Sequence, residues 1–273
     1  MPAGPLTLLV DNGSLEPAAT LALRKLAARL CARLGQKVEP VSLLHSSAID
    51  PKLLAGSPAK LLVPVMERRL AANRPEFTII PLFFGPSLAL TEYIPENIAR
   101  LREKYPKLKV AMAAPLFAAG DDRLAQILEE HVVAQLGPVP ARVALVDHGS
   151  PVAAVTAVRN ELASQLAVRL GSRVVAVAPC SMERRPEPAY AFNEPLLAGL
   201  LNTAPWTEGR VIVALQFLAP GRHAGKDGDV AKLCRAAEAK HPKLKTAPTA
   251  LVGAHPLLVE ILADRWRAAV PLT

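Results

Sequence analysis

The chain has 273 residues, of which 51% are hydrophobic and only 4% aromatic, and its formal net charge is +8. This length suits one large or two small domains. No stretch reaches the ~20 apolar residues of a transmembrane helix, and the N-terminus lacks the cationic start of a signal peptide. We therefore expect a soluble, cytoplasmic protein.

The basic residues are spread along the chain, without a basic tail or an aromatic-flanked cluster, so nucleic acid is not the expected partner. An anionic small-molecule ligand accounts for the charge equally well, as does an ordinary solvated surface. The three cysteines, Cys31, Cys180 and Cys234, form no C-x-x-C pair. That spacing argues against a disulfide framework, a zinc knuckle or an iron–sulfur site.

The sequence contains an internal duplication with an offset of 136 residues. Between Thr7 and Val41, 15 of 35 positions are identical to residues 143–177. The match returns where "YPKLK" in the first half aligns with "HPKLK" in the second. We therefore expect two homologous domains, residues 1–137 and 138–273, joined at the Pro- and Gly-rich segment "GPVPAR".

Each half shows the same alternation of β-rich apolar runs and helical segments. In the first half we expect a strand at 6–10, a helix at 16–34, strands at 37–44, 77–84 and 109–116, a helix before the fourth strand and a last helix. In the second half we expect the corresponding strands at 142–146, 173–179, 210–218 and 245–252, with a first helix at 152–170 and the same two later helices. This order predicts α/β domains, each a parallel sheet flanked by helices, related by a pseudo-two-fold duplication.

Histidines follow the ends of two predicted strands, but only in the second half. His148 lies in "ALVDHGSP", directly after the first strand, where the first half has Asn12. His223 lies in "FLAPGRHAGKDGD", after the third strand, where a local offset of 134 places Ala89. Ligands of parallel α/β sheets bind outside the carboxyl ends of the strands. Because both histidines are missing from the duplicate, a shared functional role is favoured over two structural histidines.

Several familiar sites do not fit these segments. "GRHAGKD" lacks the spacing and the Ser or Thr of a phosphate-binding loop. Asp147 stands where a histidine phosphatase would have its phosphate-binding arginine, and Ser150 beside His148 is not a catalytic triad. A metal remains, because two neutral imidazoles suit cobalt, nickel, iron or zinc. Two protein ligands alone make a weak, open site, which suits transfer of an ion rather than its storage.

These motifs, with the closing "G-x-H-P-L-L-x-E-I-L", resemble the ATP-independent (class II) chelatases, specifically the sirohydrochlorin cobalt and iron chelatases. The resemblance covers nearly the whole chain. It implies two α/β domains around a cleft for a tetrapyrrole, with His148 and His223 as the catalytic, metal-contacting pair and Glu183 as an acidic residue near them. The chain departs from the family pattern, in which two-domain relatives keep the active histidines in the first half.

The resemblance implies insertion of a divalent metal into sirohydrochlorin or a related anionic tetrapyrrole, in cobalamin or siroheme biosynthesis. Cobalt is the first choice, with iron or nickel as alternatives; the ion is a substrate, and no permanently bound cofactor is expected. We expect a monomer that binds neither nucleic acid nor membranes. The candidate substrate-binding residues are Ser150, Arg184, Arg185, Arg222 and Lys226. The competing hypotheses are a non-catalytic carrier of metal or tetrapyrrole and a hydrolase of phosphorylated small molecules.

Overall fold

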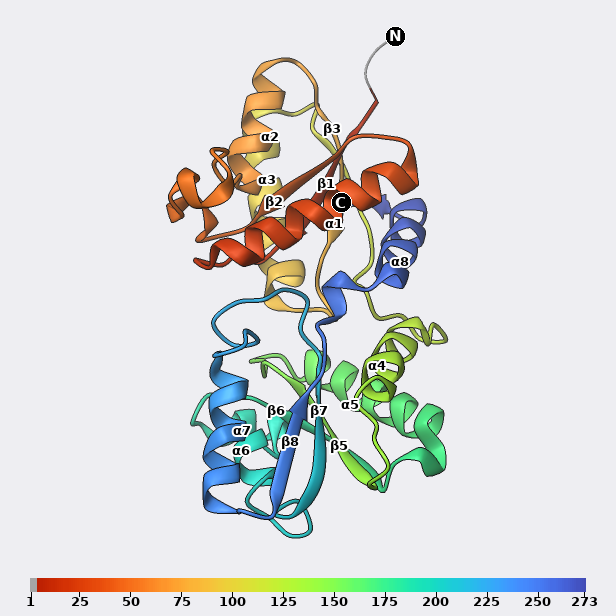
Figure 1. Cartoon of the computed structure of the whole chain (residues 1–273). Coiled ribbons are helices and arrows are strands. Elements are labelled where there is room, and N and C mark those ends of the chain that lie inside the picture. The colour runs from red at the N-terminus through yellow and green to blue at the C-terminus, as the bar shows by residue number, and fades with distance from the viewer. Residues whose placement is uncertain (1–3) are drawn as a thin grey trace. The chain divides into compact units, whose positions relative to one another are not determined.

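The computed structural model describes residues 4–273 and divides into two compact units, each with its own sheet (Figure 1). One unit runs to Ala118 and also includes Pro256–Thr273, and the other comprises Ala119–His255. Both are α/β units with parallel strands and flanking helices, as the duplicated pattern predicts. Among residues 4–273, no helix combines the length and the hydropathy that crossing a membrane requires.

The first unit contains a five-stranded sheet in the order β2-β1-β3-β4-β9. Its strands are β1 (Leu6–Asp11), β2 (Val38–Ser42), β3 (Glu76–Pro81), β4 (Lys109–Met112) and β9 (Val270–Pro271). Its helices are α1 (Pro17–Leu34), α2 (Leu62–Ala71), α3 (Ile94–Lys104) and α8 (Pro256–Arg267). The first four strands are parallel, but β9 pairs antiparallel with β4, so this sheet is mixed rather than wholly parallel as expected.

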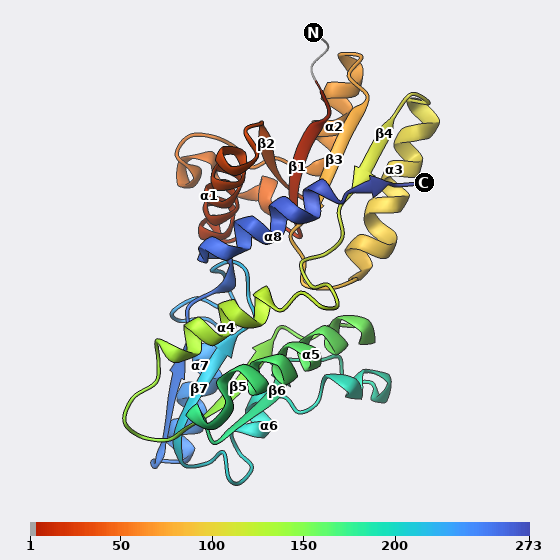
Figure 2. The same cartoon turned by 90° about the vertical axis from the view of Figure 1, so that its right-hand side faces the viewer.

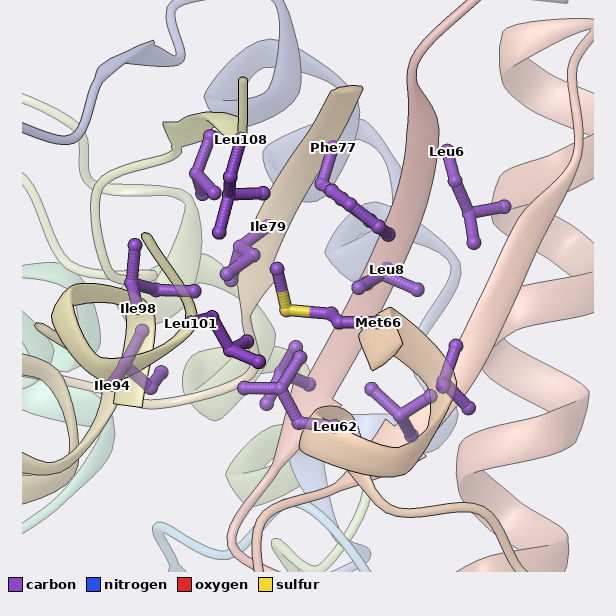
Figure 3. Close-up of a cluster of buried hydrophobic side chains, with 14 of the residues drawn as sticks. Leu6, Leu8, Leu62, Met66, Phe77, Ile79, Ile94, Ile98, Leu101 and Leu108 are labelled. Atoms are coloured by element: carbon purple, nitrogen blue, oxygen red, sulfur yellow. The ribbon is translucent and has the colours of Figure 1, made fainter. Parts of the chain in front are cut away.

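The core of the first unit lies between the sheet and helices α2 and α3 (Figure 3). Leu8 of β1 and Phe77 and Ile79 of β3 point to the same side as Met66 of α2, and all four are 2% exposed or less. Leu9, the neighbour of Leu8, is also fully buried although it points to the opposite face. The strands are thus buried on both faces, which is typical of parallel sheets covered by helices.

The second unit contains a four-stranded parallel sheet in the order β6-β5-β7-β8. Its strands are β5 (Ala141–Asp147), β6 (Ala176–Ser181), β7 (Gly209–Leu215) and β8 (Leu244–Pro248). Its helices are α4 (Arg123–Val133), α5 (Ala153–Leu170), the single turn α6 (Leu197–Leu200) and α7 (Asp229–Lys240). Helices α6 and α7 share a buried cluster with one face of the sheet, and α4 packs beside α5.

The last helix of each repeat belongs to the compact unit formed mainly by the other repeat. Helix α8, from the second repeat, lies against α1 and β3 of the first unit (Figure 2). There Arg33 Nε pairs with Glu260 at 2.7 Å, and Trp266 Nε1 donates to Thr7 Oγ1 at 3.2 Å. Helix α4, from the first repeat, belongs to the second unit, where Glu129 pairs with Arg169 of α5.

The compact units therefore differ from the sequence division into 1–137 and 138–273. The chain passes between the units at Ala118–Ala119 and again at His255–Pro256. Helix α4 buries Leu124 and Ile127 in the second unit, and α8 buries Leu258, Ile261 and Leu262 in the first. The repeats and the folded units therefore have different boundaries, because each of these two helices buries its apolar face in the unit to which it belongs.

Candidate active site

His148 occupies the turn after β5, and a close backbone approach shapes that turn. Gly149 has a φ of +92°, and a Cβ at this position would lie 1.9 Å from the carbonyl oxygen of Glu183. Only glycine fits such an approach without displacing the neighbouring chain. The N–H of Glu183 in turn donates to the carbonyl of His148 at 3.2 Å. The turns after β5 and β6 are thereby joined at the carboxyl end of the sheet.

His223 lies in the loop between β7 and α7, and the start of α7 holds this loop in place. The N–H of Val230 donates to the carbonyl of His223 at 3.1 Å, and the N–H of Asp229 donates to that of Arg222 at 3.0 Å. A Cβ at Gly228 would lie 2.7 Å from the His223 carbonyl oxygen. The loop thus turns tightly onto the helix and presents the imidazole at the carboxyl end of β7.

The structure brings the two imidazoles together. Their ring centroids are 4.6 Å apart, and the ring planes meet at 75° in an edge-to-face arrangement. The side chain of His148 is 49% exposed and that of His223 is 31% exposed. Both rings are accessible to a ligand from solvent, and a molecule that approaches one ring meets the other.

Hydrogen bonds to Nδ1 define which nitrogen each histidine offers. Nδ1 of His148 lies 3.0 Å from the carbonyl oxygen of Gly149, and Nδ1 of His223 lies 2.9 Å from Oδ2 of Asp229. Carbonyl and carboxylate oxygens only accept hydrogen bonds, so in the neutral rings Nδ1 carries the proton and Nε2 carries the lone pair. Both imidazoles therefore offer Nε2 as a metal ligand or proton acceptor.

Asp229 is a site residue that the sequence analysis missed. Hydrogen bonds from Lys232 and His223 hold the pKa of its carboxyl below the ordinary value, so it is ionised at neutral pH. An ionised partner on Nδ1 raises the basicity of the opposite nitrogen and fixes the orientation of the ring. No recognisable motif marks Asp229. Its position at the start of a helix, six residues after His223, is the sequence feature that could have indicated a partner for this histidine.

Glu183 also reaches this site. Its Oε1 lies 3.5 Å from Nε2 of His148, and its side chain is 59% exposed. Within the described part of the chain, residues 4–273, no group of three or more His, Cys, Asp or Glu side chains is arranged to hold a metal ion. Glu183 thus lies beside the imidazole and does not close a three-ligand cage in this conformation.

The predicted basic residues divide into two pairs. Arg184 pairs with Glu194 at 2.7 Å and also donates to the carbonyl oxygens of its own loop, while the guanidinium of Arg185 lies over the ring of Tyr190. Both contribute to holding the segment after β6. Arg222 and Lys226 lie on the His223 loop with exposed side chains, and Arg222 has only a 3.5 Å contact to Asp229. The second pair is the better placed to meet an anion.

Ser150 contributes to the site through its backbone. Its N–H donates to Oδ1 of Asn193 at 2.9 Å, and its carbonyl accepts from Nδ2 of Asn193 at 2.9 Å. Its hydroxyl accepts from the N–H of Val152 at 3.0 Å and so shapes the turn that leads into α5. Asn193 is fully buried and, like Asp229, was not among the predicted site residues.

The first unit has the same backbone turns at the corresponding positions but different side chains. The N–H of Leu44 donates to the carbonyl of Asn12, as the N–H of Glu183 does to that of His148. Leu44 is therefore the counterpart of Glu183, and Gly13, with a φ of +87°, is the counterpart of Gly149. The first unit has neither histidine and also lacks the acidic side chain.

A cavity of about 400 Å³ lies beside the histidine pair rather than at it. It is open to solvent between α7 and β8, and Ala224 and Lys226 of the His223 loop line one side. Cys234 and Thr246 lie among its other walls, and neither histidine borders it. Burial raises the pKa of the Cys234 thiol to about 11, so this sulfur is protonated at neutral pH.

Comparison with known proteins agrees with this geometry. The CbiX family model matches residues 6–135 and 142–269, one match for each repeat. SirB from Bacillus subtilis with Fe3+ is 18% identical with a TM-score of 0.70, and the match covers 97% of this chain and 95% of that one. SirB from Bacillus subtilis subspecies spizizenii in complex with cobalt is 17% identical with a TM-score of 0.70, over 97% and 94% of the two chains.

A third solved structure is CbiX, described as the terminal enzyme for biosynthesis of siroheme in denitrifying bacteria. It is 19% identical with a TM-score of 0.61, and the match covers 97% of this chain and 99% of that one. No curated protein sequence matches the chain. Because the family model spans both repeats, the resemblance predicted from the histidine motifs is confirmed, and the chain belongs to the CbiX/SirB-type family of sirohydrochlorin chelatases.

Proposed function

We propose that the protein inserts a divalent metal ion into sirohydrochlorin or a related anionic tetrapyrrole without using ATP. The observation that carries this proposal is the pair of adjacent imidazoles, each with Nδ1 hydrogen-bonded, so that Nε2 carries the lone pair of the neutral ring. Metal insertion needs both a ligand for the incoming ion and an acceptor for pyrrole protons.

In the proposed reaction, two pyrrole N–H bonds break and release two protons, and the ion exchanges its water and imidazole ligands for the four nitrogens of the macrocycle. Nε2 of His148 and Nε2 of His223 hold the ion or accept a proton as it leaves the macrocycle. Glu183, 3.5 Å from His148 Nε2, supplies a carboxylate that either adds an oxygen ligand or passes the proton to solvent. The weak, two-imidazole site favours release of the ion, because a closed cage of protein ligands would compete with the tetrapyrrole for it.

The ion is a substrate, and we propose cobalt first, with iron or nickel as alternatives. Imidazole nitrogen with carboxylate oxygen suits all three, so the ligand set alone ranks them weakly. The family's solved structures that carry cobalt or Fe3+ in their descriptions support the first two. The corresponding pathway is cobalamin biosynthesis for cobalt and siroheme biosynthesis for iron.

The substrate is an anionic tetrapyrrole, whose carboxylates we propose to meet Arg222 and Lys226 first. Both side chains are exposed on the loop that carries His223, so they attract an anion toward the imidazoles. Arg184, Arg185 and Ser150 act indirectly in this proposal, by holding the segments around Glu183 and His148. We further propose a cytoplasmic monomer, in keeping with three free cysteines.

The competing function is a non-catalytic carrier of metal or tetrapyrrole, which uses the same two imidazoles. The two hypotheses differ in turnover. Purified protein is incubated with a tenfold excess of sirohydrochlorin and Co2+, Fe2+ or Ni2+, and metallation is followed by the absorbance change of the macrocycle. A chelatase metallates many equivalents above the spontaneous rate. A carrier stops at one equivalent or accelerates nothing.

A further inference from the structure

A buried arginine lies beneath the His148 turn. Arg159 of α5 is 1% exposed, and its guanidinium donates to Ser181 Oγ at 2.5 Å and to the carbonyl of Asn193 at 2.9 Å. Its Nε and second Nη donate to Asn160 Oδ1, and Asp147 Oδ1 lies 3.8 Å away. A buried charge is costly to fold unless it is fully partnered, so its presence calls for a reason beyond packing.

The partners of Arg159 hold both peptide groups that follow His148. Ser181 Oγ donates to Asp147 Oδ1 at 2.6 Å, and the same carboxylate oxygen accepts from the N–H of Gly149 at 3.1 Å. On the other side, the side chain of Asn193 makes two hydrogen bonds to the backbone of Ser150. The guanidinium thus connects two hydrogen-bonded clamps: Asp147 holds the N–H of Gly149, and Asn193 holds the N–H and the carbonyl of Ser150.

The duplicated half provides an internal comparison. Helices α1 and α5 have the same length and the 136-residue offset, which places Leu23 opposite Arg159. The parallel bridges Ser42–Leu61 and Ser181–Leu196 place Pro58 opposite Asn193. The hydroxyls are kept, since Thr20 and Ser42 occupy the positions of Thr156 and Ser181.

In the first unit a cavity of about 250 Å³ lies where the network would be. Its walls include Leu23, Ser42 and Pro58, the counterparts of the three network residues. One carboxylate oxygen of Asp11, the counterpart of Asp147, is buried without a hydrogen-bond partner. The network is therefore complete in the unit that has the histidines and incomplete in the unit that lacks them.

We propose that Arg159 is a positioning residue for His148, acting through Asn193 and Asp147 to fix the turn that aims the imidazole at His223. This proposal rests on the proposed function in one respect, namely that His148 binds the metal. The order of the turn itself is a property of the fold. It can be measured without any turnover, which separates the two claims.

The test compares Arg159→Leu, which installs the residue of the first half, with Leu166→Ala. Leu166 is a fully buried residue of the same helix without a link to the network. The first measurement is amide hydrogen exchange at Ser150. Loss of the Asn193 clamp is expected to speed this exchange roughly tenfold in Arg159→Leu, and Leu166→Ala is expected to leave it at the parent value after correction for global stability.

The second measurement is Co2+ affinity, by titration in the absence of tetrapyrrole. Loss of a residue that orients a ligand costs about tenfold or more in metal affinity, so Arg159→Leu is expected to bind Co2+ at least about tenfold more weakly than parent and Leu166→Ala. Parental exchange at Ser150 together with parental Co2+ affinity in Arg159→Leu overturns the proposal. Failure of the parent to bind any of Co2+, Fe2+ and Ni2+ refutes the proposed function, while the exchange data still decide the role of Arg159.

Folding of the variant is expected, because the first unit already combines an aspartate, a serine and a threonine with leucine at this position. If Arg159→Leu does not fold, Asn193→Ala tests the same claim, since it removes both hydrogen bonds to Ser150 and leaves the guanidinium in place. The same tenfold weakening of Co2+ binding is then expected. An unchanged affinity in Asn193→Ala overturns the proposal.

Discussion

Nδ1 of His223 and Oδ2 of Asp229 lie 2.9 Å apart, across the start of α7. The carboxylate fixes the proton of the ring on Nδ1 and leaves the lone pair on Nε2. We predict that Asp229→Asn lowers Co2+ affinity and metallation rate by about tenfold, because a neutral amide no longer raises the basicity of the ring. Isothermal titration and initial-rate assays measure both quantities. Lys232→Ala, which removes another partner of Asp229, is the control and is expected to change neither by more than about twofold.

The two histidines are predicted to be needed, and their counterparts dispensable. His223→Ala is expected to lower metallation at least about tenfold without loss of fold, because it removes one of two metal-facing nitrogens. Asn12→Ala, at the counterpart of His148, is expected to keep the parental rate, since an amide is a poor metal ligand and not a base at neutral pH. A folded His223→Ala protein with the parental rate, or an inactive Asn12→Ala protein, would contradict this assignment.

Asp11 is predicted to make stability depend on pH in the first unit. Burial raises the pKa of its carboxyl from 3.8 to about 6, because Ser42 and Gly13 only partly compensate for the lost water. The folded state thus takes up the proton more readily than the unfolded state. The resulting stabilisation is complete below about 3.8 and is lost as the pH rises through about 6.

The substitution Asp11→Asn removes this titration and is expected to raise the free energy of unfolding by on the order of 2–3 kcal/mol at pH 7.5, with little change at pH 4. Asp147→Asn is the matched comparison. Burial also raises the pKa of the Asp147 carboxyl, but Ser181 and the guanidinium of Arg159 offset part of that cost, so a smaller gain is expected there at pH 7.5. Thermal denaturation at the two pH values measures both effects. Destabilisation by Asp11→Asn at pH 7.5 would show that the carboxylate is well solvated.

Gly149 is predicted to be essential for the geometry of the site, and Gly35 is its control. Both have positive φ, but a Cβ at Gly35 meets no atom within 4 Å, whereas one at Gly149 overlaps the Glu183 carbonyl. Gly35→Ala is expected to cost only the backbone strain, about 1 kcal/mol, with parental metallation. Gly149→Ala is expected to separate the turns of His148 and Glu183 and to lower metallation at least about tenfold. Equal activity in the two variants would exclude this role for the close approach.

Sequence reasoning predicted the eight parallel strands, the first helices and the position of the two histidines, because each of these is a local pattern, but it missed the short antiparallel strand β9. Apolar runs define β1 and β5. The first half of the sequence serves as a comparison for the second, because it has other residues at the positions of His148 and His223. The exchange of α4 and α8 between the units was not predictable from the repeat. The two helices carry similar apolar faces, so the sequence does not indicate whether α4 and α8 each pack on their own repeat or on the other one.

The network beneath the site was missed for a different reason. Arg159 and Asn193 are 34 positions apart and carry no motif, and only folding brings the guanidinium to the asparagine carbonyl. Arg159 is also followed by polar residues in α5, where it reads as an ordinary surface charge. The sequence already shows leucine at position 23 where the second half has Arg159. This difference indicates a buried polar network only when both side chains are known to be buried.

The central claim is that His148 and His223 together insert the metal. The most direct measurement is the rate of Co2+ insertion into sirohydrochlorin, corrected for the spontaneous reaction, for the parent protein and for the folded double variant His148→Ala/His223→Ala. We predict many turnovers by the parent and, for the double variant, a rate equal to the spontaneous one. A double variant that still turns over at the parental rate would contradict the assignment of these two imidazoles as the catalytic pair.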